Sequence, residues 1–146
     1  LSFDLQLYPH QMAAAASLAT AHPDTPIILN HAGMWVDRTL AGWQQWKAGL
    51  RMLAACPNIS VKISGLGMLD LHPTVESLRP LVLETLEVFG VNRAMFASNF
   101  PVDKLFSTFT ALWRAPACLG GVSTPPANRR AWQSARRPRP RSCRAA

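Results

Sequence analysis

Four short apolar segments, each ending in polar side chains just before a helix-like run, constrain this chain more than any other feature. They predict strands at Leu1–Leu7, Ile27–Asn30, Ile59–Ser64 and Ala94–Ala97. Short, continuously apolar segments such as Ile27–Asn30 are typical of strands buried on both faces. Because α/β proteins build their sites where a buried strand ends and a helix follows, these four exits are the places to look for chemistry.

Helical patterns separate the strands. They run from His10 or Gln11 to about Thr20, over Thr39–Ala55, from Pro73 through Pro80 to Phe89, and from Asp103 along Leu105, Phe106, Phe109, Leu112 and Trp113. Gly90 stands where a helix commonly ends in a residue with left-handed backbone. The resulting order, βαβαβαβα, repeats roughly every 30 residues and predicts an α/β fold with a parallel sheet and helices outside it.

The net charge of +7 arises entirely in the last part of the chain. Residues 1–114 contain eight basic and eight acidic residues, whereas residues 115–146 contain seven arginines, several prolines, no lysine and no acid. We therefore predict a folded body over 1–114 and a disordered Arg/Pro-rich tail over 115–146, whose composition also resembles the product of a reading-frame shift. A nucleic-acid-binding arm is the less favoured interpretation, because Trp132 is the only aromatic residue among these arginines.

Cysteine usage and hydropathy favour a cytoplasmic protein with no membrane partner. The three cysteines are odd in number and lack metal-type spacing, and the sequence shows no signal peptide. No apolar run approaches the roughly 20 residues that a membrane span requires. The chain begins at Leu1, inside a strand-like segment, so we expect a fragment of a longer protein.

Four motifs carry a resemblance to a known family. They are Phe3-Asp4-Leu5-Gln6 with Pro9-His10-Gln11, Leu29-Asn30-His31-Ala32-Gly33, Val61-Lys62-Ile63-Ser64-Gly65-Leu66, and Met95-Phe96-Ala97-Ser98-Asn99-Phe100-Pro101-Val102-Asp103. In this order they resemble the amidohydrolase-related family of the metal-dependent hydrolase superfamily, in the lactonase-like branch that includes sugar-lactone and 2-pyrone-4,6-dicarboxylate hydrolases. The resemblance covers residues 1–114.

The resemblance implies a (β/α)8 barrel of the TIM-barrel type, with its site in the loops after the strands. A full barrel needs about 250 residues, so the four units here would be the C-terminal half, strands five to eight. The His-x-His pair that the superfamily often places at its first strand does not occur in this sequence. We expect an isolated half barrel to associate with itself.

His31 and Asn99 are the catalytic candidates that the resemblance implies. A neutral imidazole at the position of His31 can ligate a divalent metal, such as zinc, or donate a hydrogen bond to a substrate carbonyl in a metal-free reaction. Many relatives carry Asp where this chain has Asn99, and an amide cannot act as a general base. Asp103, four residues further on, is interpreted as a helix N-cap.

Five further residues are candidates for binding a small-molecule substrate: His10, Lys62, Ser64, Asp4 and Gln6. Asp4 and Gln6 share one face of their strand, as do Lys62 and Ser64. Lys62 would either bind an anionic substrate group or pair with Asp4 inside the barrel. His10 would either bind substrate or cap the helix that follows it.

Three functions are consistent with these observations. The first is hydrolysis of a lactone or another cyclic ester or amide, with His31 polarising the carbonyl. The second is an inactive fragment of such an enzyme. The third is a small doubly wound α/β binding module with a basic tail that contacts nucleic acid, although the first strand lacks the glycine-rich phosphate loop that this fold usually carries.

Overall fold

The computed structural model describes residues 1–70 and 74–110. The strands are β1 (Phe3–Leu5), β2 (Ile27–Leu29), β3 (Ile59–Ile63) and β4 (Ala94–Phe96). The helices are α1 (Met12–Ala21), α2 (Leu40–Ala54), α3 (Leu66–Leu69) and α4 (Val75–Phe89), and the 3-10 turns are η1 (Pro9–Gln11), η2 (Asn30–Gly33) and η3 (Val102–Leu105). The predicted βα alternation is confirmed over this range.

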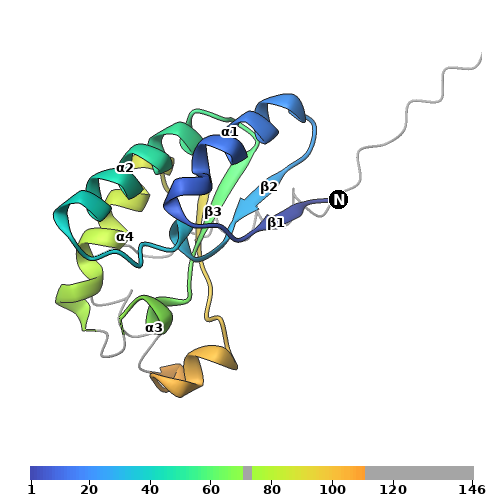
Figure 1. Cartoon of the computed structure of the whole chain (residues 1–146). Coiled ribbons are helices and arrows are strands. Elements are labelled where there is room, and N and C mark those ends of the chain that lie inside the picture. Colours follow the sequence, from blue (N-terminus) through green and yellow to red (C-terminus); the bar gives the residue numbers. More distant parts are fainter. Residues whose placement is uncertain (71–73, 111–146) are drawn as a thin grey trace, which may run out of the picture.

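The four strands form one parallel sheet in the order β1-β2-β3-β4. Because crossovers between parallel strands are right-handed, a sequential order places the connecting helices on one face of the sheet. Figure 1 shows α1, α2 and α4 along one face, and α3 with the segment around η3 beyond the ends of the strands. This is the arrangement of a barrel segment, since a doubly wound sheet needs a reversal of strand order.

The two faces of the sheet differ in burial. In β3, Ile59, Val61 and Ile63 are buried, whereas Ser60 and Lys62 between them are partly exposed. The buried row faces a core built by Trp46, Leu50 and Leu53 of α2, Leu78, Leu81 and Val82 of α4, and Met12, Ala15 and Ala19 of α1. The opposite face, with Asp4, Ile28, Ser60, Lys62 and Met95, is the one that points into the interior of a closed barrel.

Two side chains, from Asn58 and Arg93, connect neighbouring segments at the amino-terminal ends of the strands. Asn58 Nδ2 donates to the carbonyl oxygens of Ala19, His22 and Thr25, each at 3.1 Å. Arg93 donates to the carbonyl oxygens of Ala54 (2.8 Å) and Cys56 (3.1 Å) at the end of α2. These bonds satisfy carbonyl groups that the ends of α1 and α2 leave without a helical partner.

Several predicted boundaries were wrong. The strands are shorter than predicted, and the segment from Leu66, which resembled a loop, forms α3. The helix predicted from Pro73 through Pro80 to Phe89 is the single helix α4, with Pro80 inside it. Gly90 follows α4 with φ +72° and ψ 159°, a glycine conformation other than the left-handed helical one. At the predicted run from Asp103, the described residues form η3 and a helical stretch at 109–110, and the rest of the run and the predicted tail lie outside the described residues.

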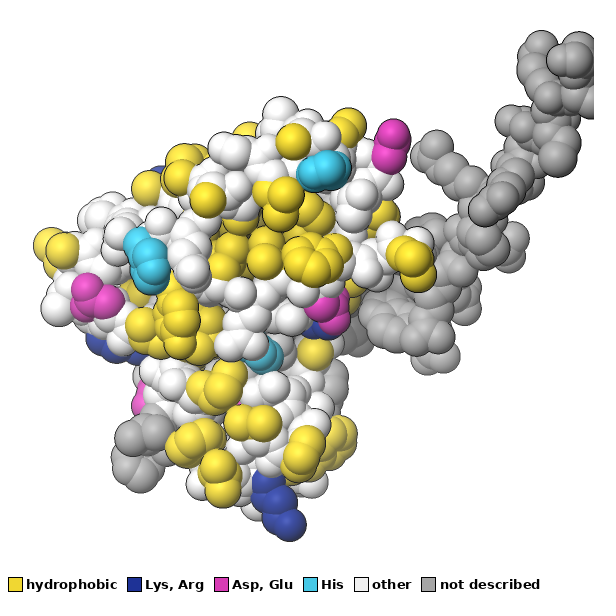
Figure 2. Space-filling view, turned by 45° about the vertical axis from the view of Figure 1, so that its right-hand side comes forward, with side chains coloured by type: hydrophobic (Ala, Val, Ile, Leu, Met, Phe, Trp, Pro, Cys, Tyr) yellow, Lys and Arg dark blue, Asp and Glu magenta, His cyan; other side chains and the backbone are white. Residues whose placement is uncertain are grey.

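The described residues contain no membrane-spanning helix, and one face of their surface is rich in apolar side chains (Figure 2). Among residues 1–70 and 74–110, no helix is long and apolar enough to cross a bilayer. On the face shown in Figure 2, hydrophobic side chains occupy more of the surface than Lys and Arg do. Leu1, Phe3 and Val36 are among the large apolar residues exposed to solvent.

Candidate active site

The exit of β2 is a tight left-handed turn that carries His31. Four successive residues have positive φ: His31 (54°), Ala32 (48°), Gly33 (72°) and Met34 (51°). The turn is closed by a hydrogen bond from the Met34 N–H to the His31 carbonyl (3.0 Å). Left-handed backbone costs a non-glycine residue about 1–2 kcal/mol, so contacts around the turn must hold it.

Trp46 of α2 supplies one of those contacts. Its side chain is fully buried, and Nε1 donates to the carbonyl oxygen of Ala32 at 2.7 Å. Trp46 also lies against Trp35 and Trp43, with ring centroids 5.6 and 4.9 Å away. The core helix therefore fixes the backbone that positions His31.

The exits of β2 and β3 meet at a hydrogen bond between His31 and Ser64. Nδ1 of His31 lies 2.9 Å from Oγ of Ser64, which is only 2% exposed. The next residue, Gly65, has φ +64°, and a Cβ there would lie 2.6 Å from His31 Nδ1. Ser64 and Gly65 together determine where the imidazole lies.

The electrostatic surroundings favour the neutral form of His31. Burial lowers the pKa of His31 below its ordinary value, and the positive charge of Lys62 acts in the same direction. The negative charge of Asp103 and the contact with Ser64 partly oppose this shift of the pKa. The neutral imidazole, which carries a single N–H, is therefore the favoured form.

The exit of β4 joins Asn99 to Asp103. Asn99 has φ 55°, and its Nδ2 donates to Asp103 Oδ1 at 3.2 Å. Asp103 is fully buried, and its Oδ2 has no hydrogen-bond partner among the described residues. The interpretation of Asp103 as an N-cap was wrong, because the residue before η3 is Pro101 and the carboxylate faces Asn99 instead.

The remaining predicted residues lie in two places. Lys62 Nζ bonds Asp4 Oδ2 at 2.9 Å across the open face of the sheet, so the pairing inside the barrel is the alternative that the structure contains. Gln6 is exposed just after β1. His10 is exposed in η1 and stacks on Tyr8, with 6.1 Å between the ring centroids. In the sequence it lies well before His31 and Ser64.

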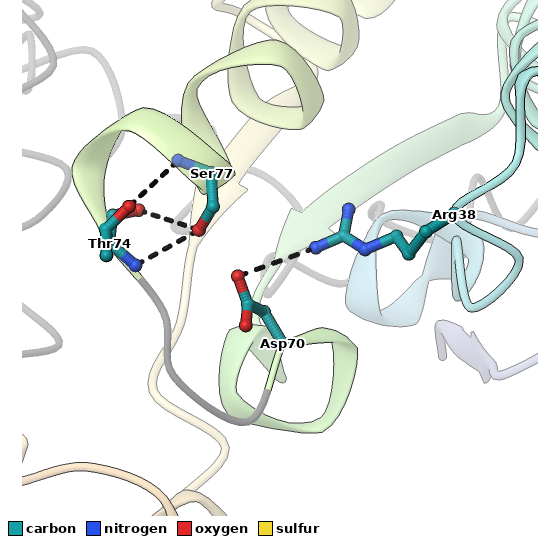
Figure 3. Close-up of polar contacts among 4 residues, drawn as sticks. All are labelled: Arg38, Asp70, Thr74 and Ser77. Atoms are coloured by element: carbon teal, nitrogen blue, oxygen red, sulfur yellow. Dashed lines mark hydrogen bonds and ion pairs between the residues drawn. The ribbon is translucent and has the colours of Figure 1, made fainter.

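A separate pocket of about 580 Å³ opens among the loops that follow β2 and β3. It is lined by Trp35, Arg38, Leu69, Asp70 and Ser77. In Figure 3, Arg38 extends toward Asp70, with 3.9 Å between their nearest charged atoms, while Thr74 and Ser77 cap the start of α4. The guanidinium of Arg38 also lies 4.1 Å above the Trp35 ring. Neither His31 nor Ser64 is among the described residues that line this pocket.

A metal ion needs several ligating side chains close together. In the part of the chain that the structure describes, no group of three His, Cys, Asp or Glu side chains is arranged to hold one. A metal site in a protein usually has at least three protein ligands. The described residues alone do not fit a metal centre.

Sequence reasoning missed three residues that shape this site: Asp103, Trp46 and Gly65. Asp103 was identified but interpreted only as a helix N-cap. Trp46 is an apolar-stripe position of the predicted helix Thr39–Ala55, and its indole N–H, which needs a partner when buried, is the signal for a second role. Gly65, directly after a strand, was the signal for a close approach.

Comparison with known proteins places the chain in one family. The sequence profile of the amidohydrolase family matches residues 1–133. The chain is 54% identical over 115 residues to an uncharacterized protein, y4mH, of Sinorhizobium fredii, covering 79% of this chain and 38% of that protein. It is 30% identical over 111 residues to an L-fucono-1,5-lactonase of Burkholderia ambifaria, covering 75% of this chain and 38% of that enzyme.

A solved structure supports the same assignment at the level of the fold. The crystal structure of an amidohydrolase from Burkholderia multivorans with bound zinc has a TM-score of 0.77 at 24% identity, covering 89% of this chain and 48% of that one. The chain thus spans about two fifths of its curated relatives and half of this structure, which agrees with the predicted partial (β/α)8 barrel. The predicted resemblance is confirmed: the chain belongs to the amidohydrolase family.

Proposed function

We propose that this chain supplies one half of the active site of a lactone hydrolase, with His31 as the residue that polarises the substrate carbonyl. The observation that carries the proposal is the position of His31 at a strand exit, held by Ser64 from the neighbouring exit. The Burkholderia ambifaria relative is an L-fucono-1,5-lactonase, which makes sugar lactones the first substrate class to examine.

We assign the proton of neutral His31 to Nε2, so that the Ser64 hydroxyl donates to Nδ1. A serine hydroxyl can donate to Nδ1, and His31 is the partner that the described residues offer to Ser64 Oγ. With Nδ1 as the acceptor, Nε2 bears the hydrogen and can donate it to a carbonyl oxygen. This donor would stabilise the oxyanion that develops when water attacks, a contribution that is typically about 10²–10³ in kcat.

In the reaction, the water oxygen bonds to the carbonyl carbon and the bond from that carbon to the ring oxygen breaks. The proton released by water ends on the ring oxygen, giving a hydroxy acid. Asn99 would orient the water or a substrate hydroxyl, because its amide does not titrate and cannot remove a proton. Lys62, already paired with Asp4, would reach an anionic substituent only by exchanging that partner.

No step is assigned to a metal ion here, because the described residues do not assemble a three-ligand site. The zinc in the Burkholderia multivorans amidohydrolase makes ligands from the other half of the barrel a reasonable proposal for the complete enzyme. The partner that we propose is a small-molecule substrate. Full activity would also require association with the rest of a barrel.

The experiment joins this chain to the part of the Sinorhizobium fredii relative that it does not match. The fusion is assayed on L-fucono-1,5-lactone and other aldonolactones, with and without a chelator. His31→Ala should lower kcat/KM by about 10²–10³, whereas His22→Ala, at the opposite edge of the sheet, should not. Equal activity of the His31→Ala variant and the parent would contradict the proposal.

A further inference from the structure

Asp103 is a buried carboxylate that folding alone does not explain. Its side chain is fully buried, one oxygen accepts a single hydrogen bond from Asn99, and the other has no partner among the described residues. Burial of a charged group with so few hydrogen bonds destabilises the folded state. A buried polar atom without a partner calls for a specific reason, and function is one of the few available.

Two hydrogen bonds connect Asp103 to Asn99. The Asp103 N–H donates to the Asn99 carbonyl (3.2 Å), and Asn99 Nδ2 donates to Asp103 Oδ1 (3.2 Å). An ionised carboxylate can only accept hydrogen bonds, so Asp103 selects the NH2 end of the amide. The same NH2 group lies 3.7 Å from Met68 Sδ, which leaves the acceptor Oδ1 as the end of the amide available to a ligand.

The charge of Asp103 also reaches the second catalytic candidate. Burial raises the pKa of Asp103, while the Asn99 hydrogen bond and the positive form of His31 lower it. Lys62 in turn acts on His31. Helix α3, which packs against η3, carries no titratable side chain. One buried charge therefore interacts with both candidate residues.

We propose that Asp103 is a positioning residue of this site: it locks the Asn99 amide so that Oδ1 accepts a hydrogen bond from the attacking water. The inference rests on the proposed lactone hydrolysis. It assigns the carboxylate of this exit an indirect role, since Asp103 does not touch the substrate and acts through the amide. The site then contains Asn99 Oδ1 as a hydrogen-bond acceptor of fixed orientation, while the negative charge of Asp103 holds the NH2 end of the same amide.

The test exchanges the two groups. Asp103→Asn lets the Asn99 amide take either orientation and should lower kcat by about 10–10²-fold with little change in KM. Asn99→Asp places two carboxylates within hydrogen-bond distance, so they must share a proton, and it should lower kcat and alter the pH–rate profile. The double variant Asn99→Asp/Asp103→Asn restores one donor and one acceptor, and it should exceed both single variants by at least about tenfold. The control is Asp24→Asn, an exposed acid in a turn.

A purely structural role would give a different pattern. Activity would then follow thermal stability, and the double variant would be no more active than the Asn99→Asp single variant, which would overturn the proposal. If Asp103→Asn does not fold, the double variant decides: folded and active supports the proposal, folded and inactive overturns it.

A second readout is independent of hydrolysis. In the fusion labelled with ¹⁵N-asparagine, the side-chain NH2 resonances of Asn99 are identified by their loss in Asn99→Asp. Asp103→Asn should shift them, and Asp24→Asn should not. Unchanged resonances in Asp103→Asn would overturn the positioning role. If the parent fusion hydrolyses no lactone but the resonances shift, the proposed function fails while the hydrogen-bonded orientation stands.

Discussion

Gly65 and His31 are in such close contact that the position of the imidazole depends on the absence of a side chain at residue 65. A Cβ at Gly65 would lie 2.6 Å from His31 Nδ1 and 2.9 Å from Cγ. Real Cβ atoms do not approach neighbours this closely, so any larger residue would displace the ring. The glycine also has φ +64°, a conformation that other residues adopt only with strain.

Gly65→Ala should therefore separate His31 from Ser64 and reduce lactone hydrolysis by about 10²-fold, the effect expected from a displacement of about 1 Å. The matched control is Gly90→Ala, at φ +72° with no atom within 4 Å of the added Cβ. Both variants should lose stability through backbone strain, measured by thermal unfolding. Only Gly65→Ala should lose activity, and equal loss in both would contradict a steric effect on His31.

Trp46→Phe should destabilise the chain by about 1–3 kcal/mol, because the Ala32 carbonyl loses its 2.7 Å hydrogen bond in a buried setting. Trp43→Phe reduces ring area in the same aromatic stack but keeps this bond, so its effect should be smaller. Urea unfolding of the two variants measures the difference. Similar losses would show that ring packing alone, without the bond, supports the turn.

The stability of the chain should decrease in mild acid because of His31. Its pKa is lowered in the folded state, chiefly by burial. As the pH falls through the ordinary histidine pKa of about 6.5, the unfolded state takes up the proton first, so the free energy of unfolding decreases until the pH is below the lowered folded pKa. His31→Gln should flatten this part of the curve.

Asp103 acts in the opposite direction at lower pH. Burial raises its pKa, so between the ordinary and the raised pKa the folded state holds the proton and stability decreases as the pH rises. Asp103→Asn should remove this component. Unfolding curves that keep the parent pH dependence in both variants would contradict these assignments.

The chain alone should associate with itself in a concentration-dependent manner. Among residues 1–70 and 74–110, no helix packs against the sheet face that carries Ile28 and Met95, and β1 and β4 are the two edge strands. Ile28→Lys should shift analytical ultracentrifugation profiles toward smaller species. Leu83→Lys, an exposed position on α4, is the control. A stable monomer at all concentrations would argue against an open half barrel.

Local rules found the strand exits because polar residues after a short apolar strand are visible in sequence. His31, Ser64 and Asn99 were identified in this way. The Lys62–Asp4 pair was one of two alternatives, and only the alignment of the strands decided between them. The short α3 was missed because a Gly-Leu-Gly segment is typical of loops.

Asp103 shows what local rules could not supply. An acidic residue near the start of a helical pattern is a common N-cap, and nothing nearby in the sequence shows that it is fully buried. Its partner Asn99 also contacts Met68 of α3, which reaches this strand exit only in the fold. Likewise, the bond between Trp46 and Ala32 spans 14 residues and requires the left-handed turn to exist.

The hydrogen bonds of Asn58 and Arg93 stabilise the amino-terminal ends of the strands, whereas the strained turns at His31 and Asn99 lie at the carboxyl-terminal ends. Mutations that alter the exits therefore leave those anchors intact. Natural evolution or laboratory selection can change substrate preference at the carboxyl-terminal ends of the strands, while the amino-terminal ends maintain the ability to fold. Libraries randomised at the strand exits should consequently yield more soluble variants than equal libraries that include Asn58 and Arg93.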